Sequence, residues 1–434
     1  MPATARSSSG PAASGPEGRP PSSRRFHAVV TVAGVAFGLT APLTAVFAVH
    51  LGAGPLLAGL AVSSLSFSVL LLDTLGTRAL PRLEPRRALS LALLLFGVGS
   101  LVSALAPNLT VMVLARVGQG VGAALFSAVG PQLALRTAPA GAAGRALGRF
   151  NGAWFLGISL GPLLGGALAG VGTPGTGLRL AFAVCAAVGV AGALVARTSL
   201  MAMPTGRRPR LSLPRLGDLA TPRPLLALGI GGVGQALRSG IAMTLLPLIA
   251  ARQLGLTGLG LGSVLSVLAL CDVAAMLVSG QLSDRVGRLP VLLTGIGCGV
   301  AGALVTRTAV QRGSIGLFVL GCALLGAAVG TAWVTPAAAV LDLAGRPEAG
   351  LAAYRILADV GLGSGGVVAG AGVAAGGPAS ALIAVAVVLL GLAGLVLLLR
   401  ETRPASARGA RAPAPPAAPV AGSVPRPHPH PSVP

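Results

Sequence analysis

Charged side chains inside long apolar stretches are the residues of this sequence most able to do chemistry. Asp272 lies within the apolar stretch 258–282, and Asp359 lies within 352–375, four residues after Arg355. A carboxylate out of contact with water is costly to keep ionised, so it can take up and release a proton, whereas a nearby arginine favours the ionised form. We therefore expect Asp272 to be the leading proton carrier and Asp359 the second. A structural ion pair is the alternative for each.

Two arginines also interrupt apolar stretches, where a charge is expensive in hydrocarbon and usually functional. Arg116 lies three residues before Gln119, and Arg238 lies three residues after Gln235, so each pair shares a helical face. Two buried guanidinium groups favour a neutral or anionic small molecule over a dication. The candidate cavity residues are Arg238, Gln235, Gln119, Asn151, Trp154 and Trp333. Helix packing or lipid contact is the alternative for the aromatic side chains.

The composition predicts that these residues belong to a membrane protein. The chain has 434 residues, of which 53% are hydrophobic and 10% charged, and its mean hydropathy is +0.85. A soluble domain carries about 25% charged residues, so this chain has too little polar surface to coat a soluble globule. The formal net charge of +22 comes from basic residues that fall mainly between apolar runs, without aromatic interleaving. We therefore expect a lipid bilayer as partner and no nucleic acid.

The apolar runs predict helices that cross the bilayer, each of which needs about 20 residues. Lipid leaves no water for unpaired backbone groups, and a barrel would show short alternating segments instead. The predicted fold class is therefore an all-α membrane protein with twelve transmembrane helices in two pseudo-symmetric six-helix bundles. The predicted spans are 28–49, 57–77, 88–106, 109–132, 150–171, 178–196, 224–250, 258–282, 290–309, 314–341, 352–375 and 379–399.

The arginines of the connecting segments predict the orientation. Connections after even-numbered spans are basic, whereas 50–56 and 106–108, which follow odd-numbered spans, contain no arginine. Cytoplasmic loops carry the excess of basic residues, so we expect a multi-pass protein of the plasma (inner) membrane with both termini cytoplasmic. The expected domains are a disordered leader 1–25, an N-terminal bundle 26–196, a basic cytoplasmic linker 197–223, a C-terminal bundle 224–400 and a disordered Pro-rich tail 401–434.

Three short patterns connect the candidate residues with these elements. The eighth connection holds Gly280-Gln-Leu-Ser-Asp284-Arg285-Val-Gly287-Arg288, span 4 holds Arg116-Val-Gly-Gln119-Gly120-Val-Gly122-Ala-Ala124, and span 5 holds Gly157-Ile-Ser-Leu-Gly161-Pro162-Leu-Leu-Gly165-Gly166. Small residues four apart share a helix face and let another helix pack closely. Pro162 lacks an N–H group and therefore bends its helix. Generic Gly-rich packing is the alternative interpretation of the span-5 pattern.

Together these patterns resemble the loop, span-4 and span-5 signatures of the major facilitator superfamily, and the span-5 pattern is similar to that of its drug/proton antiporters. The resemblance covers roughly 26–400. An internal repeat supports it, because Gly157 and Gly161 recur at one constant offset as Gly361 and Gly365. The resemblance implies alternating access, in which two bundles rock around a central site. It also implies export coupled to an inward proton, with Arg116 beside the proton site.

The resemblance also implies a conformational latch at the eighth connection, which comprises Gly280, Asp284, Arg285, Gly287, Arg288 and Asp342. In the family, the aspartate of this loop meets the N-terminus of a helix in the other half, where the helix dipole favours a carboxylate. Asp342 is the expected partner of Arg288. We expect the latch in the second half alone, because span 4 holds no acidic counterpart of Asp342 and Arg82 stands where the first-half repeat would carry the aspartate. Solvated loop charges are the alternative.

One departure from the family pattern concerns proton coupling. Many of its drug/proton antiporters carry an acidic residue in span 1, whereas 28–49 contains none.

The sequence favours a secondary transporter that exports small amphipathic molecules or drugs in exchange for protons. A dedicated exporter of one metabolite, such as a sugar or natural product, is the alternative within transport. A polytopic membrane enzyme or receptor is the alternative of another class. We expect no enzyme activity and no cofactor, because HExxH and P-loop patterns are missing from the sequence. The four cysteines lie in apolar runs without CxxC, so we expect no disulfide and no metal site. We expect the chain to act as a monomer.

Overall fold

The computed structural model describes residues 23–75, 84–136, 138, 142–199 and 221–402, and the regular elements in these ranges are all helices. Most of the predicted leader, linker and tail lies outside them. The first half contains α1 (Ser23–Thr40), α2 (Leu43–His50), α3 (Pro55–Leu75), α4 (Pro85–Leu105), α5 (Leu109–Arg136), α6 (Ala143–Ala169) and α7 (Pro174–Ser199). The second half contains α8 (Pro222–Gly240), the π-helical turn η3 (Ile241–Leu245), α9 (Leu246–Arg252), α10 (Gly258–Val286), α11 (Arg288–Arg312), α12 (Ile315–Leu343) and α13 (Pro347–Leu399).

The helices are long and apolar enough for a membrane protein. Ten candidate spans lie in the described part of the chain, and α1 with α2 form a further one that bends by 40°. Helix α13 has 53 residues, which at 1.5 Å per residue is about 80 Å, far more than a bilayer core of about 30 Å. The predicted all-α membrane fold is therefore confirmed. It has twelve crossings when the bent pair counts as one and α13 as two.

The breaks within spans follow from local sequence. Helix α13 is interrupted at Gly377, whose φ of 76° lies outside the helical region and is readily adopted by glycine. Pro378 follows immediately and cannot donate a helical hydrogen bond. The first span of each half is also irregular beside a proline. Pro42 stands at the bend between α1 and α2, and Pro247 follows the π-helical turn η3. A proline cannot donate the next helical hydrogen bond, so it leaves a place where the helix can bend.

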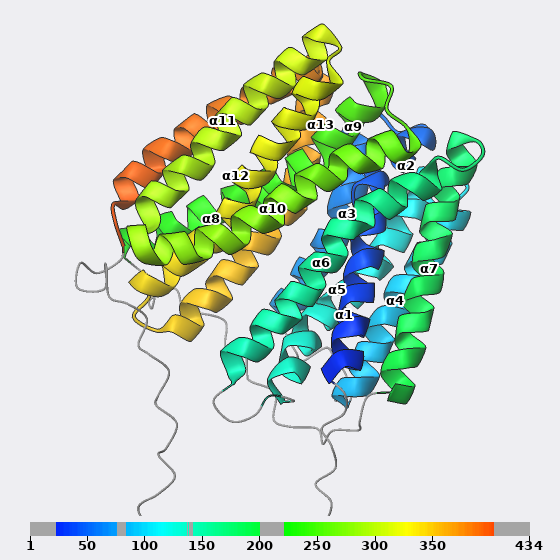
Figure 1. Cartoon of the computed structure of the whole chain (residues 1–434), viewed down its shortest axis with the longest axis horizontal. Helices are drawn as coiled ribbons and strands as arrows, with labels where there is room; N and C mark the ends of the chain where they lie inside the picture. The colour runs from blue at the N-terminus through cyan, green and yellow to red at the C-terminus, as the bar shows by residue number, and fades with distance from the viewer. Residues whose placement is uncertain (1–22, 76–83, 137, 139–141, 200–220, 403–434) are drawn as a thin grey trace, which may run out of the picture.

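The helices form two groups that meet along two seams (Figure 1). One seam joins α3 to α13, and the other joins α6 to α10. Glycines allow the backbones to approach closely at both seams. A Cβ atom on Gly59 would overlap the carbonyl of Gly366, and one on Gly166 would overlap the backbone of Gly262. The two groups therefore pack backbone to backbone at these positions, and any larger side chain there would hold them apart.

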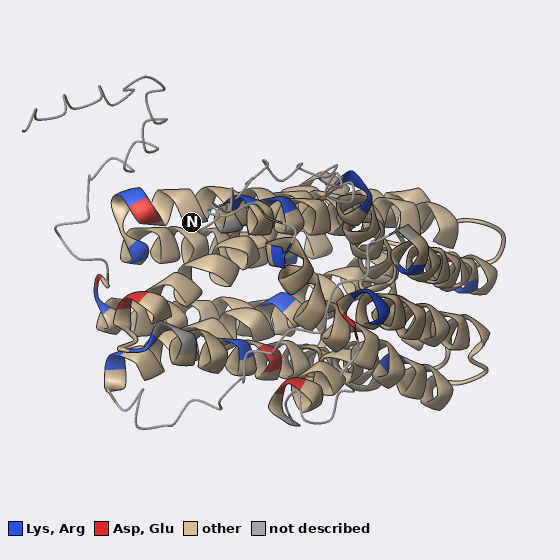
Figure 2. Cartoon of the chain, turned by 90° about the horizontal axis from the view of Figure 1, so that it is seen from below, with Lys and Arg blue, Asp and Glu red and all other residues tan. Residues whose placement is uncertain are grey.

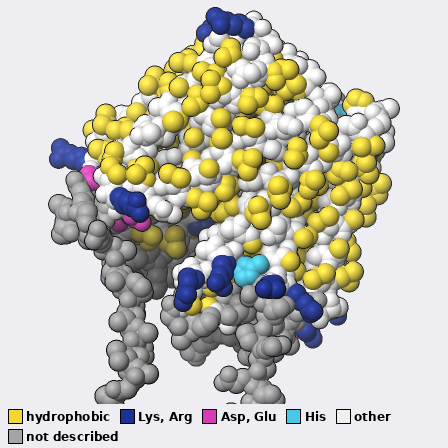
Figure 3. Space-filling view, viewed as in Figure 1, with side chains coloured by type: hydrophobic (Ala, Val, Ile, Leu, Met, Phe, Trp, Pro, Cys, Tyr) yellow, Lys and Arg dark blue, Asp and Glu magenta, His cyan; other side chains and the backbone are white. Residues whose placement is uncertain are grey.

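The outer surface suits a lipid environment. The face in Figure 3 is covered largely by hydrophobic side chains, and basic groups lie near its margins. Leu105 and Leu398 are each 70% exposed, which is unfavourable in water but expected against lipid. The described start of α1 and the end of α13 lie at the same end of the molecule (Figure 1), which we call the terminal end. We call the other end, which holds α2 and α9, the distal end.

The α6–α10 seam gives a testable prediction for stability. The substitution Gly166→Ala places a Cβ against the Gly262 backbone, so it should destabilise the protein by about 1–3 kcal/mol through overpacking and lower the melting temperature in detergent. The matched control is Gly152→Ala on the same helix, where a Cβ meets no atom within 4 Å. Because alanine is the better helix former, this variant should melt at or slightly above the wild-type temperature. Equal melting temperatures for the two variants would contradict the close packing of the seam.

Candidate functional site

Arg238 of α8 and Asp272 of α10 form an ion pair inside the second group of helices. The Nη1 and Nη2 atoms of Arg238 donate to Oδ1 and Oδ2 of Asp272, at 3.1 and 2.5 Å. Both side chains are only about one-tenth exposed. The guanidinium also lies 4.8 Å from the ring centroid of Trp333 on α12, a favourable cation–π distance. A two-pronged bond of this kind stabilises both charges inside an apolar bundle.

Other polar groups surround this ion pair. The Nε2 atom of Gln235 donates to the carbonyl of Ala332 at 3.4 Å, and the Tyr354 hydroxyl donates to the carbonyl of Trp333 at 2.9 Å. The Oε1 atom of Gln235 is buried and has no hydrogen-bond partner among the described residues. An unsatisfied buried acceptor is unfavourable, so it is a position where a ligand donor would be stabilised.

Glycines explain how α12 comes close enough to Asp272. A Cβ atom on Gly330 would overlap the carbonyl of Asp272, and one on Gly326 would overlap the carbonyl of Leu268. Helices α10 and α12 are therefore in backbone contact where the aspartate lies. The sequence pairs Arg238 with Gln235 on one helical face but does not link them to Asp272 or Trp333, and the structure brings all four together.

A second buried polar group lies in the first half around Arg116. Its Nη1 atom donates to Oε1 of Gln119 at 3.0 Å, and Nε2 of Gln119 donates to the Ser100 hydroxyl at 2.7 Å. Ser100 in turn contacts the Cys185 sulfur at 3.2 Å, and that thiol donates to the carbonyl of Ala36. This chain of contacts ties α5 to α4, α7 and α1. Within the described residues Arg116 has no carboxylate partner, in contrast to Arg238.

The remaining aromatic and amide candidates lie on α6. Trp154 belongs to an aromatic cluster, with its ring centroid 4.9 Å from that of Phe126 and 5.8 Å from that of Phe37. Asn151 is exposed. The predicted cavity residues therefore do not form one site. Arg238, Gln235 and Trp333 lie at the ion pair, Gln119 lies beside Arg116, and Trp154 and Asn151 lie on α6.

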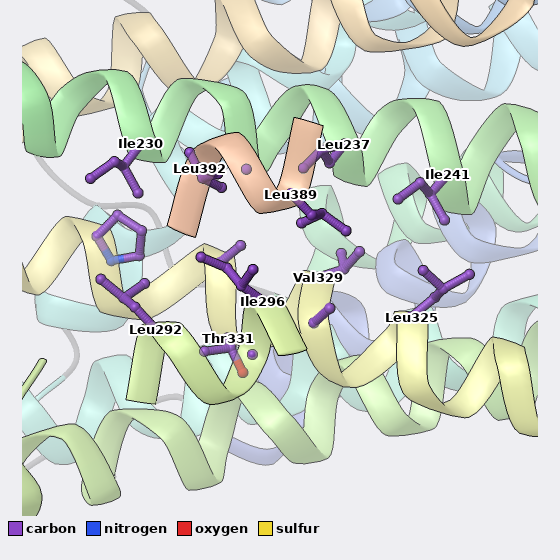
Figure 4. Close-up of a pocket in the computed structure, with 15 residues that line it drawn as sticks. Ile230, Leu237, Ile241, Leu292, Ile296, Leu325, Val329, Thr331, Leu389 and Leu392 are labelled. Atoms are coloured by element: carbon purple, nitrogen blue, oxygen red, sulfur yellow. The ribbon is translucent and has the colours of Figure 1, made fainter. Parts of the chain in front are cut away.

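The cavity of Figure 4 lies near the Arg238 site but has a different character. It is enclosed by α8, α11, α12 and α13, and its volume is about 30 Å³. The lining side chains, among them Ile230, Leu292 and Leu389, are apolar apart from Thr331. A space of this size holds about one water molecule, and its lining offers few polar partners. It is a packing gap inside the second bundle and too small for a drug-sized molecule.

Figure 2 shows the basic and acidic residues of the helices in a view from below. Arg288, the first residue of α11, is bonded in three directions. Its Nη1 atom donates to Asp284 at 2.6 Å and to the Ser283 hydroxyl at 2.8 Å, and its Nε atom donates to Asp342 at 3.0 Å. The expected contact between Arg288 and Asp342 is thus present. Gly287 has a φ of 114°, which lets the chain turn directly from α10 into α11.

A carboxylate also caps the N-terminus of α11, but it belongs to Glu401. Its Oε1 and Oε2 atoms accept from the backbone N–H groups of Arg288 and Leu289, at 2.9 and 3.2 Å. The hydroxyl of Thr402 donates to Asp342. The sequence analysis placed Glu401 in the disordered tail and therefore missed this contact.

The other latch residues surround this cluster. The Asp284 side chain is 65% exposed, and Arg285 is exposed as well. Gly280 faces Val334 of α12. The expectation that the first half lacks a latch falls on 76–83, which lies outside the described residues.

Arg355 of α13 bonds across the seam between the two groups. Its Nε atom lies 2.6 Å from Oδ2 of Asp73 on α3, and its Nη2 atom donates to the Ser127 hydroxyl of α5 at 2.8 Å. From the sequence alone, the expected partner of Arg355 is Asp359, one turn along the same helix. In the structure Oδ2 of Asp359 is buried and has no hydrogen-bond partner among the described residues.

The glycines of the span-5 pattern lie on two faces of α6. Cβ atoms on Gly157, Gly161 and Gly165 would overlap the backbone of α1, whereas one on Gly166 would meet α10 across the seam. Pro162 lies inside α6. This pattern therefore sets the packing of α6 both within its own bundle and against the other.

Comparison with known proteins identifies the family of this fold. Residues 26–235 and 228–429 each match the family model of the Major Facilitator Superfamily. The chain belongs to the major facilitator superfamily. The two matches correspond to the two helix groups and agree with the predicted resemblance. No curated protein sequence matches the chain.

Solved structures of the superfamily share this fold. The nucleoside transporter NupG, as its D323A mutant, superposes with a TM-score of 0.70 at 13% identity, covering 87% of this chain and 99% of that one. A bacterial homologue of the human lysosomal transporter Spinster, inward-facing and occupied, gives 0.69 at 17%, covering 91% and 100%. The D-xylose-proton symporter gives 0.66 at 18%, covering 88% and 98%. At these identities the superpositions show a shared fold.

The buried ion pair gives a second prediction for stability. Arg238→Gln leaves the Asp272 carboxylate buried without its partner, so it should destabilise the protein by about 3–5 kcal/mol. The double variant Arg238→Gln/Asp272→Asn removes both charges and should recover much of that loss. Thermal unfolding of the two single variants and the double variant in detergent measures the coupling. Additive losses would show that the two groups do not stabilise each other.

Proposed function

We propose that this superfamily member exports small amphipathic molecules from the cytoplasm in exchange for protons. The observation that carries the proposal is the buried, two-pronged bond between Arg238 and Asp272. The resemblance of the α6 pattern around Pro162 to the antiporter signature supports the direction of transport. The arginines of the connecting segments support an inner-membrane protein whose terminal end is cytoplasmic.

The coupling rests on competition for the Asp272 carboxylate. A proton on Asp272 removes the negative charge that holds Arg238, and a substrate that donates a hydrogen bond needs the same oxygen atoms. Proton and substrate therefore exclude each other, which is the requirement for exchange. Between these two states Arg238 neutralises the carboxylate, so the empty site does not leave an unpaired charge in the bundle.

The substrate is expected to combine an apolar body with a polar donor. The Trp333 face and the apolar surroundings would bind the body, and Oε1 of Gln235 would accept from a second donor. Arg116, whose charge has no carboxylate partner among the described residues, disfavours a dication by repulsion.

Alternating access requires the two bundles to move against each other around this site. The glycine seams α3–α13 and α6–α10 are smooth surfaces on which such rocking can take place. The cluster of Arg288, Asp284 and Asp342 lies wholly in the second bundle at the terminal end. We propose that this cluster, with Glu401, is the latch that keeps the start of α11 in place while the bundles rock.

A dedicated exporter of one metabolite is the second candidate. It is favoured by the unsatisfied Oε1 of Gln235, since an acceptor at a fixed position selects a particular hydroxyl or amine. Transport assays with a panel of dyes and with sugars separate this candidate from broad drug export.

The test of proton-coupled export uses ethidium efflux from energised cells. The wild type should extrude the dye, and a protonophore should abolish extrusion. Asp272→Asn should reduce protonophore-sensitive efflux at least about tenfold, because an amide cannot exchange a proton. The matched control Glu84→Gln changes a carboxyl group at the terminal end and should remain within twofold of the wild type.

A second readout separates coupling from binding. In proteoliposomes, Asp272→Asn should still exchange labelled for unlabelled substrate across the membrane, since that exchange moves no net proton. Efflux by Asp272→Asn that is as fast and as protonophore-sensitive as the wild type would refute the role of Asp272.

A further inference from the structure

The bond between Arg355 and Asp73 joins the two halves of the protein at a position that the coupling site does not use. Asp73 lies two residues before the end of α3, and Arg355 lies eight residues after the start of α13, so both are near the terminal end. Ser127 of α5 accepts a second bond from Arg355 and holds the guanidinium toward the first bundle. The contact is therefore one that must break when the bundles separate at this end.

A third charge completes the cluster. Asp359 lies one helical turn beyond Arg355, on the same face, and it interacts electrostatically with both Asp73 and Arg355. One guanidinium thus faces two carboxylates. When both carboxylates are ionised, the cluster carries an excess negative charge, and Oδ2 of Asp359 is buried without a bonding partner.

Among the described residues, the other helices packed against this cluster bring no further free charge of opposite sign to it. On α8, the groups directed at α13 include Gly232 and Gln235, and Arg238 is bonded to Asp272. On α12, the carbonyl of Trp333 accepts from Tyr354, which is uncharged. The group that can remove the excess charge is a proton, and Asp359 is the better place for it, because Asp73 already has the guanidinium as partner.

We propose that Asp73 and Asp359 form a proton-binding site whose occupancy determines how strongly Arg355 holds the two bundles together. With a proton on Asp359, Arg355 is left to Asp73 alone and the terminal end is clamped. Without it, the Asp359 carboxylate repels Asp73 and attracts Arg355 to its own helix, so the clamp weakens. Acid therefore favours the closed terminal end, and alkaline conditions favour its opening.

This inference extends the proposed transport cycle but does not depend on Asp272. The proton described here acts on the interface between the bundles, whereas the proton at Asp272 competes with substrate. The two can consequently be tested apart, by measuring the opening of the terminal end without any substrate.

The experiment measures the distance between spin labels by pulsed electron paramagnetic resonance, at pH values from about 5 to 8. The labels are attached at Leu71→Cys on α3 and Leu351→Cys on α13, both exposed positions that flank the cluster. The four native cysteines are replaced by alanine in the reference protein and in every variant. The reference should shift from a short to a long distance as the pH rises.

The variants give opposite results if the proposal is correct. Asp359→Asn imitates the protonated state and should keep the short distance at every pH. Asp73→Ala removes the cross-bundle bond and should keep the long distance at every pH. Since that variant can fail to fold, Asp359→Glu serves as a second test and should retain the response with a shifted midpoint. The control Glu84→Gln alters a carboxylate that pairs with Arg86 and Arg87 of its own bundle and should respond as the reference does.

A reference protein whose distance does not change with pH would overturn the proposal, and so would Asp359→Asn with an unchanged response. If the distance responds as expected while dye efflux proves independent of protons, the clamp stands and the proposed export mechanism falls. If efflux is proton-coupled through Asp272 while Asp359→Asn responds like the reference, the export mechanism stands and the clamp falls.

Discussion

A charged side chain inside the apolar helices of this protein is most stable with a partner of opposite charge, because an unpaired charge there is costly. Arg238 and Asp272 satisfy each other through two hydrogen bonds, 3.1 and 2.5 Å long, in the middle of the second bundle. The cost of separating them is large because water is excluded there. A proton or a ligand donor that takes the place of Arg238 at the Asp272 carboxylate therefore strongly changes the stability of the Arg238 charge. This sensitivity is what allows a single ion pair to couple two transported species.

The second constraint is geometric and comes from glycine. The seams between the bundles bring backbone against backbone at Gly59 with Gly366 and at Gly166 with Gly262. Smooth contacts can separate and re-form with little change in side-chain packing. The bond from Arg355 to Asp73 is a polar contact across one of these seams. The protein thus combines seams that slide easily with a charged contact that can be made or broken.

The sequence predicted the parts of this account that depend on local patterns. Apolar length predicted the spans, and the short motifs predicted both the family and the contact of Arg288 with Asp342. Partners from different spans were harder to predict. Arg238 and Asp272 were each identified as functional candidates, but no spacing rule connects two helices that meet only in the folded bundle.

The partner of Arg355 also could not be predicted from spacing along the chain. Along the sequence its nearest carboxylate is Asp359, one turn away, whereas the fold brings Asp73 from the opposite bundle. Glu401 was similarly assigned to a polar tail by composition, although it caps α11. The interruption of α13 at Gly377 agrees with the predicted boundary between two spans, because the glycine–proline sequence there is a local signal.

The central claim is that proton and substrate compete for the carboxylate of Asp272. The most direct test is to add ethidium to purified protein in a weakly buffered detergent solution and to measure proton release with a pH indicator. The wild type should release a proton when the dye binds, over the pH range in which Asp272 is protonated, whereas Asp272→Asn should bind dye without releasing one. Equal proton release by the wild type and Asp272→Asn would contradict it.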